Sequence, residues 1–387
     1  MSKPKAPRDP RLDMFRGIAL VMIFLNHIPG QIYERFTSRN FGHSDAAEGF
    51  VFMAGAAAAL AYGPRLIDGL NWAALRKVWN RAWTLYLVHL FTAFWAIAII
   101  AGAALWFGGE ELLTKNAFKP LTTKPLEFLI GIPALTHQLG YVNILPMYAV
   151  LLLAAPFLIR LGQIAPRALL AGAILFWVTT GQFRLNLPNF PFEGGWFFNP
   201  LAWEILFCLG ILTGLALREG KRFVPVNRWL VGVAALWLVF CAFWVNSEPA
   251  MASLGHVSWQ LREWGVPFYL VEFDKTFVSL PRLTHILALA YILSLPGLVP
   301  AFAASRFAAP LCMLGRHGLP VFATGTILAI LAQAIRHVHP AGLAQDTLLI
   351  VGGLMVQLAL AYIRGRIAAP AKAPEPATAN NTRVALA

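Results

Sequence analysis

Residues 12–30 read LDMFRGIALVMIFLNHIPG, an apolar stretch that contains two basic side chains, Arg16 and His27. Eleven positions along an α-helix turn through about 1100°, close to three full turns, so both side chains are expected on one face, about 16 Å apart along the axis. Ionisable groups inside a membrane helix are costly and usually face a cavity, a partner or a pathway. The stretch therefore predicts a membrane helix with a functional polar face.

Similar apolar stretches recur along the chain, which is 58 % hydrophobic and 13 % charged, with a mean hydropathy of +0.63. This composition is unlike that of an ordinary soluble protein. Because a membrane span needs about 20 mostly apolar residues, we predict ten spans: 12–30, 45–62, 83–107, 141–159, 168–182, 199–217, 229–246, 284–302, 317–335 and 347–363. The shorter segment 126–138 contains Pro133 and is expected to be re-entrant or interfacial. The predicted fold is an all-α integral membrane domain over 1–366, with a disordered cytoplasmic tail over 367–387.

The distribution of charge tests this topology. With a cytoplasmic N-terminus, 21 of the 31 Lys and Arg residues fall on the inner side and 10 on the outer side, as the positive-inside rule requires. Both termini are then expected in the cytoplasm. The net charge of +13 reflects membrane topology, so the lipid bilayer rather than nucleic acid is the expected partner. The three cysteines have no Cys-x-x-Cys spacing, and we expect no metal site.

A dense polar stretch, RNFGHSDAAE over 39–48, follows the first predicted span. Asp45 and Glu48 are three residues apart, so they share a helix face that can pack beside His27. A carboxylate that binds one imidazole nitrogen leaves the other nitrogen as a general base for a hydroxyl that attacks an acyl donor. Asp45 could equally be only the N-cap of the second span. The residues expected at the reaction are His27, Arg16, Asp45 and Glu48.

A basic group lies on the opposite side of the predicted membrane. Arg76, Lys77 and Arg81 precede the span 83–107, in the same layer as Arg16. Arginine forks bind phosphate in a bidentate manner, so this layer could hold a phosphorylated cytoplasmic donor such as a coenzyme A thioester. Topology alone would also place positive charge here. We expect the donor to contact Arg16, Arg76, Arg81 and Arg316.

Three outer loops, 108–140, 183–198 and 247–283, are rich in polar residues, and the last two mix them with tryptophan. Flat aromatic faces and polar forks are what a sugar-binding surface uses, whereas an aromatic belt at the membrane interface is the alternative interpretation. The residues expected to contact a sugar acceptor are Arg39, Asn40, Trp196, Asn199, Trp203 and Glu204.

Several motifs carry a family resemblance: RLDMFRG (11–17), IFLNHIP (23–29), RNFGHSDAAE (39–48), FVFMAG (50–55), NPLAW (199–203) and LGRHGLPVF (314–322). The Arg16-x10-His27 pattern resembles that of the acyltransferase-3 membrane enzymes, which O-acylate sugars and glycans. The other motifs resemble the OpgC branch, whose members are ten-helix proteins of the bacterial inner membrane assigned to succinylation of osmoregulated periplasmic glucans. The resemblance extends over about residues 10–335.

The resemblance implies a membrane O-acyltransferase with a cytoplasmic acyl-CoA donor, a periplasmic glucan acceptor and no bound cofactor. Succinyl is the implied acyl group, and acetyl is the alternative. His27 takes the place of the catalytic residue, Arg16 that of its partner, and Arg76 and Arg81 that of the basic motif before the third helix. Two other classes remain open, namely a transporter of glycan precursors or organic anions and a non-catalytic partner of a glucan-synthesis complex.

Overall fold

The computed structural model describes residues 9–339 and 342–368, which are largely helical and include no β-strand. The predicted all-α fold is therefore confirmed. The α-helices are α1 (Pro10–Asn26), α2 (Ala46–Tyr62), α3 (Trp72–Phe107), α4 (Pro120–Thr123), α5 (Pro125–Gly131), α6 (Ile144–Ile164), α7 (Pro166–Gln182), α8 (Pro200–Arg218), α9 (Arg228–Asn246), α10 (Glu248–Glu263), α11 (Phe268–Val271), α12 (Leu280–Leu293), α13 (Leu298–Ala303), α14 (Ala309–Arg316), α15 (Gly318–Val338) and α16 (Leu343–Ala368). Short 3-10 helices lie at Ile32–Phe36, Ser38–Asn40, Gly63–Arg65, Glu110–Thr114 and Arg306–Ala308.

Seven helical segments in the described part of the chain are long and apolar enough to cross a membrane. They are Ala46–Arg65, Trp72–Phe107, Ile144–Ile164, Pro200–Arg218, Arg228–Asn246, Gly318–Val338 and Leu343–Ile367. The other three predicted spans coincide with α1, α7 and α12, which have 17, 17 and 14 residues. The chain is thus a multi-pass membrane protein by helix length and composition, and the prediction of ten spans is confirmed for seven.

Two predicted boundaries differ from the observed helices. The predicted span 284–302 is interrupted between Leu293, where α12 ends, and Leu298, where α13 begins; Pro296 and Gly297, at φ 118°, lie in this break. The predicted tail begins too early, because α16 continues to Ala368. The rest of the predicted tail, from residue 369, lies outside the described residues.

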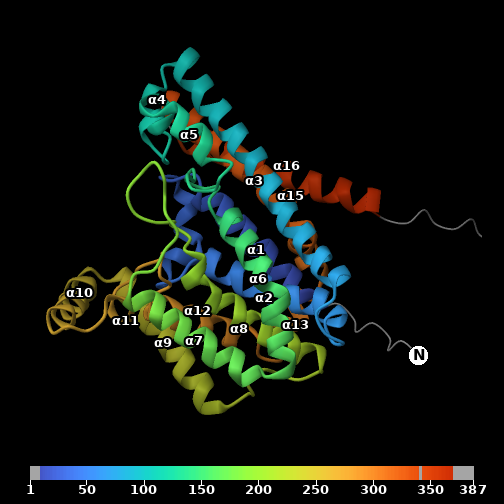
Figure 1. The fold of residues 1–387 in the computed structure, drawn as a ribbon. Helices are drawn as coiled ribbons and strands as arrows, with labels where there is room; N and C mark the ends of the chain where they lie inside the picture. The colour runs from blue at the N-terminus through green and yellow to red at the C-terminus, as the bar shows by residue number, and fades with distance from the viewer. Residues whose placement is uncertain (1–8, 340–341, 369–387) are drawn as a thin grey trace, which may run out of the picture.

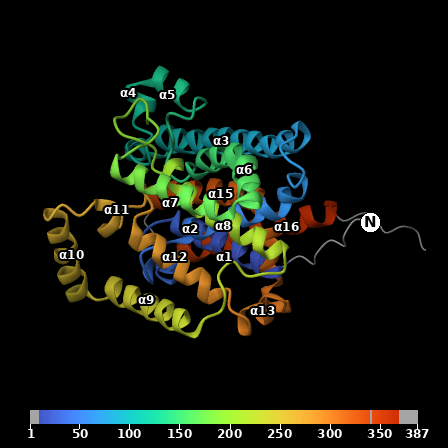
Figure 2. The same ribbon diagram turned by 60° about the horizontal axis from the view of Figure 1, so that its bottom comes forward.

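Helices α1, α2 and α8 lie in the middle of the bundle in both views, while α9 and α10 lie at its periphery (Figures 1 and 2). The short helices α4 and α5 cover one end of α3, where Phe118 and Phe128 pack with Ala93 and Ala96. The predicted interfacial segment 126–138 thus forms α5 and the turns that follow it.

Glycines bring the central helices into backbone contact. A Cβ atom on Gly55 of α2 would lie 2.1 Å from the Phe207 carbonyl oxygen of α8, and one on Gly210 would lie 2.0 Å from that of Phe52. A Cβ atom on Gly17 of α1 would lie 2.0 Å from the Leu311 carbonyl oxygen of α14. Membrane helices associate through such small residues because lipid offers no hydrophobic gain on packing. These contacts fix the position of α1, which carries both Arg16 and His27.

Candidate functional site

His27 stands at the C-terminal end of α1. Its backbone N–H donates to the Ile23 carbonyl oxygen at 3.0 Å, and its own carbonyl accepts from Nε2 of Gln333 at 2.6 Å. The imidazole ring contacts the Tyr141 ring, with 4.6 Å between centroids. Its Nδ1 atom is buried and has no hydrogen-bond partner among the described residues. The backbone of His27 is therefore held on both sides, while one ring nitrogen is buried without a hydrogen-bond partner in the described chain.

Four charged side chains gather beside His27 and form what we call the outer cluster: Asp45, Glu48, Lys275 and Arg282. Nζ of Lys275 is paired with Oδ2 of Asp45. Arg282 holds Glu48 through Nε at 2.7 Å and also through Nη2. Nη2 of Arg282 lies 3.7 Å from Oδ2 of Asp45, so the four charges are linked. Two acids and two bases compensate one another where α2 and α12 begin.

The local sequence explains how the acids of the outer cluster are placed. Asp45 is the N-cap of α2, and its Oδ1 atom accepts from the Ala47 N–H at 2.8 Å. The Glu48 side chain reaches back to accept from the Asp45 N–H at 3.0 Å, which completes a capping box. Burial raises the pKa of Asp45, but the charges of Lys275 and Arg282 outweigh that effect and hold the pKa below its usual value. Asp45 is therefore an ionised cap at neutral pH.

The relation of His27 to these acids differs from the expected one. Lys275 and Asp45 both interact electrostatically with His27. Within the described part of the chain, however, no hydrogen bond joins the His27 ring to Asp45 or Glu48, whose oxygens bind α2 and the two cations instead. The cap interpretation of Asp45 is thus correct, and any influence of Asp45 on His27 in this arrangement is electrostatic.

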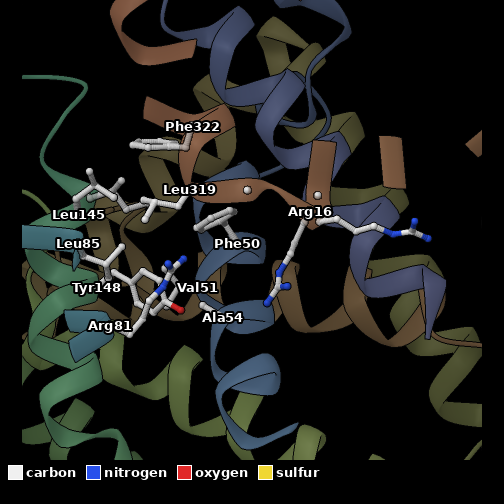
Figure 3. Close-up of a pocket in the computed structure, with 14 residues that line it drawn as sticks. Arg16, Phe50, Val51, Ala54, Arg81, Leu85, Leu145, Tyr148, Leu319 and Phe322 are labelled. Atoms are coloured by element: carbon white, nitrogen blue, oxygen red, sulfur yellow. The ribbon is translucent and has the colours of Figure 1, made fainter. Parts of the chain in front are cut away.

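A second polar region surrounds a cavity of about 130 Å³, which we call the inner cavity. Arg16 of α1, Arg81 of α3 and Arg316 of α14 all line it, together with Tyr148 of α6. Figure 3 shows Arg81 and Tyr148 on one wall and Arg16 on the opposite one. Nη2 of Arg16 donates to the Met53 carbonyl oxygen at 3.2 Å, and Nε of Arg316 lies 3.4 Å from Oδ2 of buried Asp13. Three arginines from distant parts of the sequence therefore converge on one space.

Arg76 is the one predicted donor contact that the structure places elsewhere. It is exposed near the start of α3 and does not line the inner cavity, whereas Arg81, five residues later, does. Helical phase explains the difference, because five residues turn the side chain through about 500°, well away from the same face.

The start of α6 forms part of the wall of the inner cavity. This wall includes Ile144 and Leu145, which begin α6 three and four residues after Tyr141. Tyr141 in turn contacts the His27 ring. The first turn of α6 therefore lies between the inner cavity and the Tyr141 ring that contacts His27.

The residues expected to contact a sugar acceptor fall into two groups. Arg39 is exposed on the His27 side, and Nδ2 of its neighbour Asn40 donates to the Glu34 carbonyl oxygen at 2.6 Å. Trp196, Asn199 and Trp203 are buried and donate to the carbonyl oxygens of Pro188, Leu185 and Lys275. Glu204 is also buried and accepts from Sγ of Cys208 at 3.1 Å, while its Oε1 atom has no partner in the described chain. The buried residues act as internal supports here rather than as a surface for sugar.

Sequence reasoning missed Lys275 and the pairing of Arg282. Both belong to an outer segment, 247–283, in which no periodic pattern singles them out. The signal that could have found them is the need for compensation, since two acids at the start of an apolar helix require nearby cations. A further outer pair was also missed, in which Oγ of Ser44 lies 2.7 Å from Nδ1 of His285.

Comparison with known proteins gives a single family. A family model described as OpgC protein matches residues 8–369. No curated protein and no solved structure matches the chain.

Proposed function

Because the chain belongs to the OpgC family of glucan-modifying membrane proteins, we propose that it is an O-acyltransferase. The proposed reaction moves an acyl group, succinyl, from cytoplasmic acyl-CoA to a hydroxyl of a periplasmic glucan. The observation that carries the proposal is that Nδ1 of His27 is buried without a hydrogen-bond partner in the described chain, at the end of the helix whose Arg16 lines a cavity with Arg81 and Arg316. The proposed orientation places the inner cavity toward the cytoplasm and the outer cluster toward the periplasm of a bacterial inner membrane.

The inner cavity is proposed to hold the donor. Arg16, Arg81 and Arg316 supply the planar, permanently charged forks that suit phosphate groups. Most of the other residues that line the cavity are apolar, among them Leu145, Leu319 and Phe322. This combination suits a thioester that carries phosphates at one end of a long, weakly polar arm. The distance of about 16 Å between Arg16 and His27 along α1 is within the reach of such an arm.

His27 is proposed to act as the general base. Its Nδ1 atom takes the proton of the glucan hydroxyl as the hydroxyl oxygen attacks the thioester carbonyl carbon. The new C–O bond forms, the C–S bond breaks, and the proton held by His27 passes to the leaving thiolate, so that an ester and free coenzyme A result. The contact with Tyr141 positions the ring of His27 during this step, and the bond from Gln333 holds the His27 backbone carbonyl.

The reaction can be tested with the purified protein and a His27→Ala variant, each given succinyl-CoA and a periplasmic β-glucan. We expect wild type alone to release coenzyme A in an acceptor-dependent manner and to add the mass of a succinyl group to the glucan. Acyl transfer by the His27→Ala variant at the wild-type rate would refute the role of His27.

The same preparation distinguishes transfer from transport. In sealed vesicles a transporter would move an organic anion or a glycan precursor without a thioester. If wild type gives flux but neither coenzyme A release nor an acylated glucan, with acetyl-CoA also inert, the acyltransferase proposal fails.

A further inference from the structure

The two ion pairs of the outer cluster are unequal. Arg282 binds Glu48 with two nitrogen atoms, and both side chains are deeply buried, with 11 % and 0 % exposed. Lys275 binds only Asp45 among the described acids, and its side chain is 22 % exposed. The Lys275 ammonium is therefore the more accessible of the two cations.

Asp45 has other partners if Lys275 turns away. Its Oδ1 atom is bound by the Ala47 N–H at 2.8 Å, and its Oδ2 atom lies 3.7 Å from Nη2 of Arg282. A buried carboxylate that loses its only cation is strongly destabilised. Because Arg282 stays in range, Asp45 does not meet that condition, so Lys275 can exchange its partner at low cost.

Two tryptophan side chains hold the backbone around Lys275. Nε1 of Trp203 donates to the Lys275 carbonyl oxygen at 3.0 Å, and Nε1 of Trp177 donates to that of Phe277 at 3.0 Å. A lysine ammonium is a point charge on a four-carbon stem. A fixed backbone and a partly exposed ammonium group suit a residue that meets a ligand rather than one that only supports the fold.

The position of Lys275 decides which ligand atom it meets. Lys275 and Asp45 both interact electrostatically with His27, the residue beside which the thioester carbon is placed. In a dicarboxylic acyl group the free carboxylate lies only a short carbon chain away from that thioester carbon. A carboxylate at that point needs a cation on the His27 side of the bundle, and the Lys275 side chain is more exposed than that of Arg282.

We propose that Lys275 is the specificity determinant for an acyl donor with a terminal carboxylate, which its ammonium binds in exchange for Asp45. This inference rests on the proposed acyl transfer and assigns the selective contact within it. An acetyl group offers no such partner, so it gains nothing from Lys275. Selection thus acts on the acyl group at the outer cluster and not among the arginines of the inner cavity, which face the part of the donor that all acyl-CoA molecules share.

The test is a competition between succinyl-CoA and acetyl-CoA, at equal concentration and in the same tube, with the full-length protein and a β-glucan acceptor. The ratio of succinylated to acetylated glucan is measured by mass spectrometry for wild type, Lys275→Met and Lys275→Arg. We expect Lys275→Met to lower the ratio by about tenfold or more, since hydrogen bonds to charged groups are among the stronger ones. Lys275→Arg should keep most of the selectivity, and Lys221→Met, which alters an exposed pair with Glu219, should match wild type.

Because the ratio comes from one tube, it does not depend on how much of a variant is folded. A ratio in Lys275→Met equal to that of wild type overturns the inference, as does an equal loss of both products. A wild type that acylates glucan but does not prefer succinyl also overturns it while leaving acyl transfer intact. A wild type that transfers neither group counts against the proposed function itself.

Discussion

The outer cluster, where α2 and α12 begin, and the inner cavity, lined by Arg16, Arg81 and Arg316, differ in the side chains that surround their charges. At the outer cluster Asp45 and Glu48 are matched by Lys275 and Arg282 within the protein. The inner cavity is lined by three arginines and by no acid, with Asp13 behind Arg316. Burying charge is costly unless it is compensated. The outer cluster thus pairs its cations with carboxylates of α2, whereas the wall of the inner cavity presents arginine side chains from three different helices.

The largest expected effect separates chemistry from donor binding. His27→Ala should lower the rate of transfer by about 10²- to 10⁴-fold, because a positioned general base contributes that much. Donor affinity, set in the inner cavity, should change little, and titration calorimetry with a non-reactive acyl-CoA analogue measures it. Loss of donor binding together with activity would show that the two regions are not independent.

The next effect tests whether the outer cluster is a closed set of charges. Arg282→Met leaves the fully buried Glu48 without its bidentate partner, and we expect a loss of about 3–5 kcal/mol in the free energy of unfolding. The double variant Arg282→Met with Glu48→Met should recover much of the loss in denaturant unfolding. If the double variant is as unstable as the single one, charge compensation is not what Arg282 provides.

The inner cavity should respond in binding rather than in stability. Arg81→Gln removes one charged fork from the cavity, so the KM for acyl-CoA is expected to rise about tenfold with kcat less affected. Arg76→Gln on the same helix is the matched control, because Arg76 lies outside the cavity. Steady-state kinetics with varied donor compares them, and equal effects of the two substitutions would contradict the assignment of Arg81.

The smallest expected effect is on the pH dependence of the free energy of unfolding, through His43 near the outer cluster. Burial first, and then the charges of His285 and Arg282, lower the pKa of His43 from 6.5 to about 4, so His43 is neutral in the folded protein at neutral pH. The unfolded chain takes up the proton as the pH falls through 6.5, so this contribution to stability is present above that value and declines below it. Between pH 7 and pH 6 the decline is about 0.7 kcal/mol.

His43→Gln should remove that decline, which thermal unfolding at the two pH values would detect as a smaller drop in Tm than in wild type. An unchanged drop would mean that other groups determine the pH dependence.

The comparison also shows what the sequence could predict. The helical period alone placed Arg16 and His27 on one face of α1 and placed Asp45 and Glu48 at the start of α2. The helical period says nothing about packing between distant segments. It therefore could not predict the pairing of Lys275 with Asp45, which are 230 residues apart. Nor did it distinguish Arg81 from Arg76, because that distinction depends on how α3 is rotated against α6.

Local chemistry was misjudged at two kinds of position. Trp196 and Trp203 were expected at a sugar surface, but their indole N–H groups bind carbonyl oxygens inside the protein. An indole has the same composition in either setting, and only its burial distinguishes them. The Pro296-Gly297 pair is a local signal for a break in a helix. The prediction of one span over 284–302 gave more weight to the apolar residues on either side of that pair.

The close glycine contacts between α1 and α14 have a consequence for how the family can diversify. Gly17 and Gly315 adjoin Arg16 and Arg316, and a Cβ atom on Gly315 would lie 1.8 Å from the Asp13 carbonyl oxygen. Single substitutions can therefore change the charges that line the cavity. The width of the cavity depends on the spacing of α1 and α14, which changes only if both helices change at their contact. We therefore expect specificity for a new donor to evolve through exchanges such as arginine to glutamine before it evolves through a wider cavity entrance.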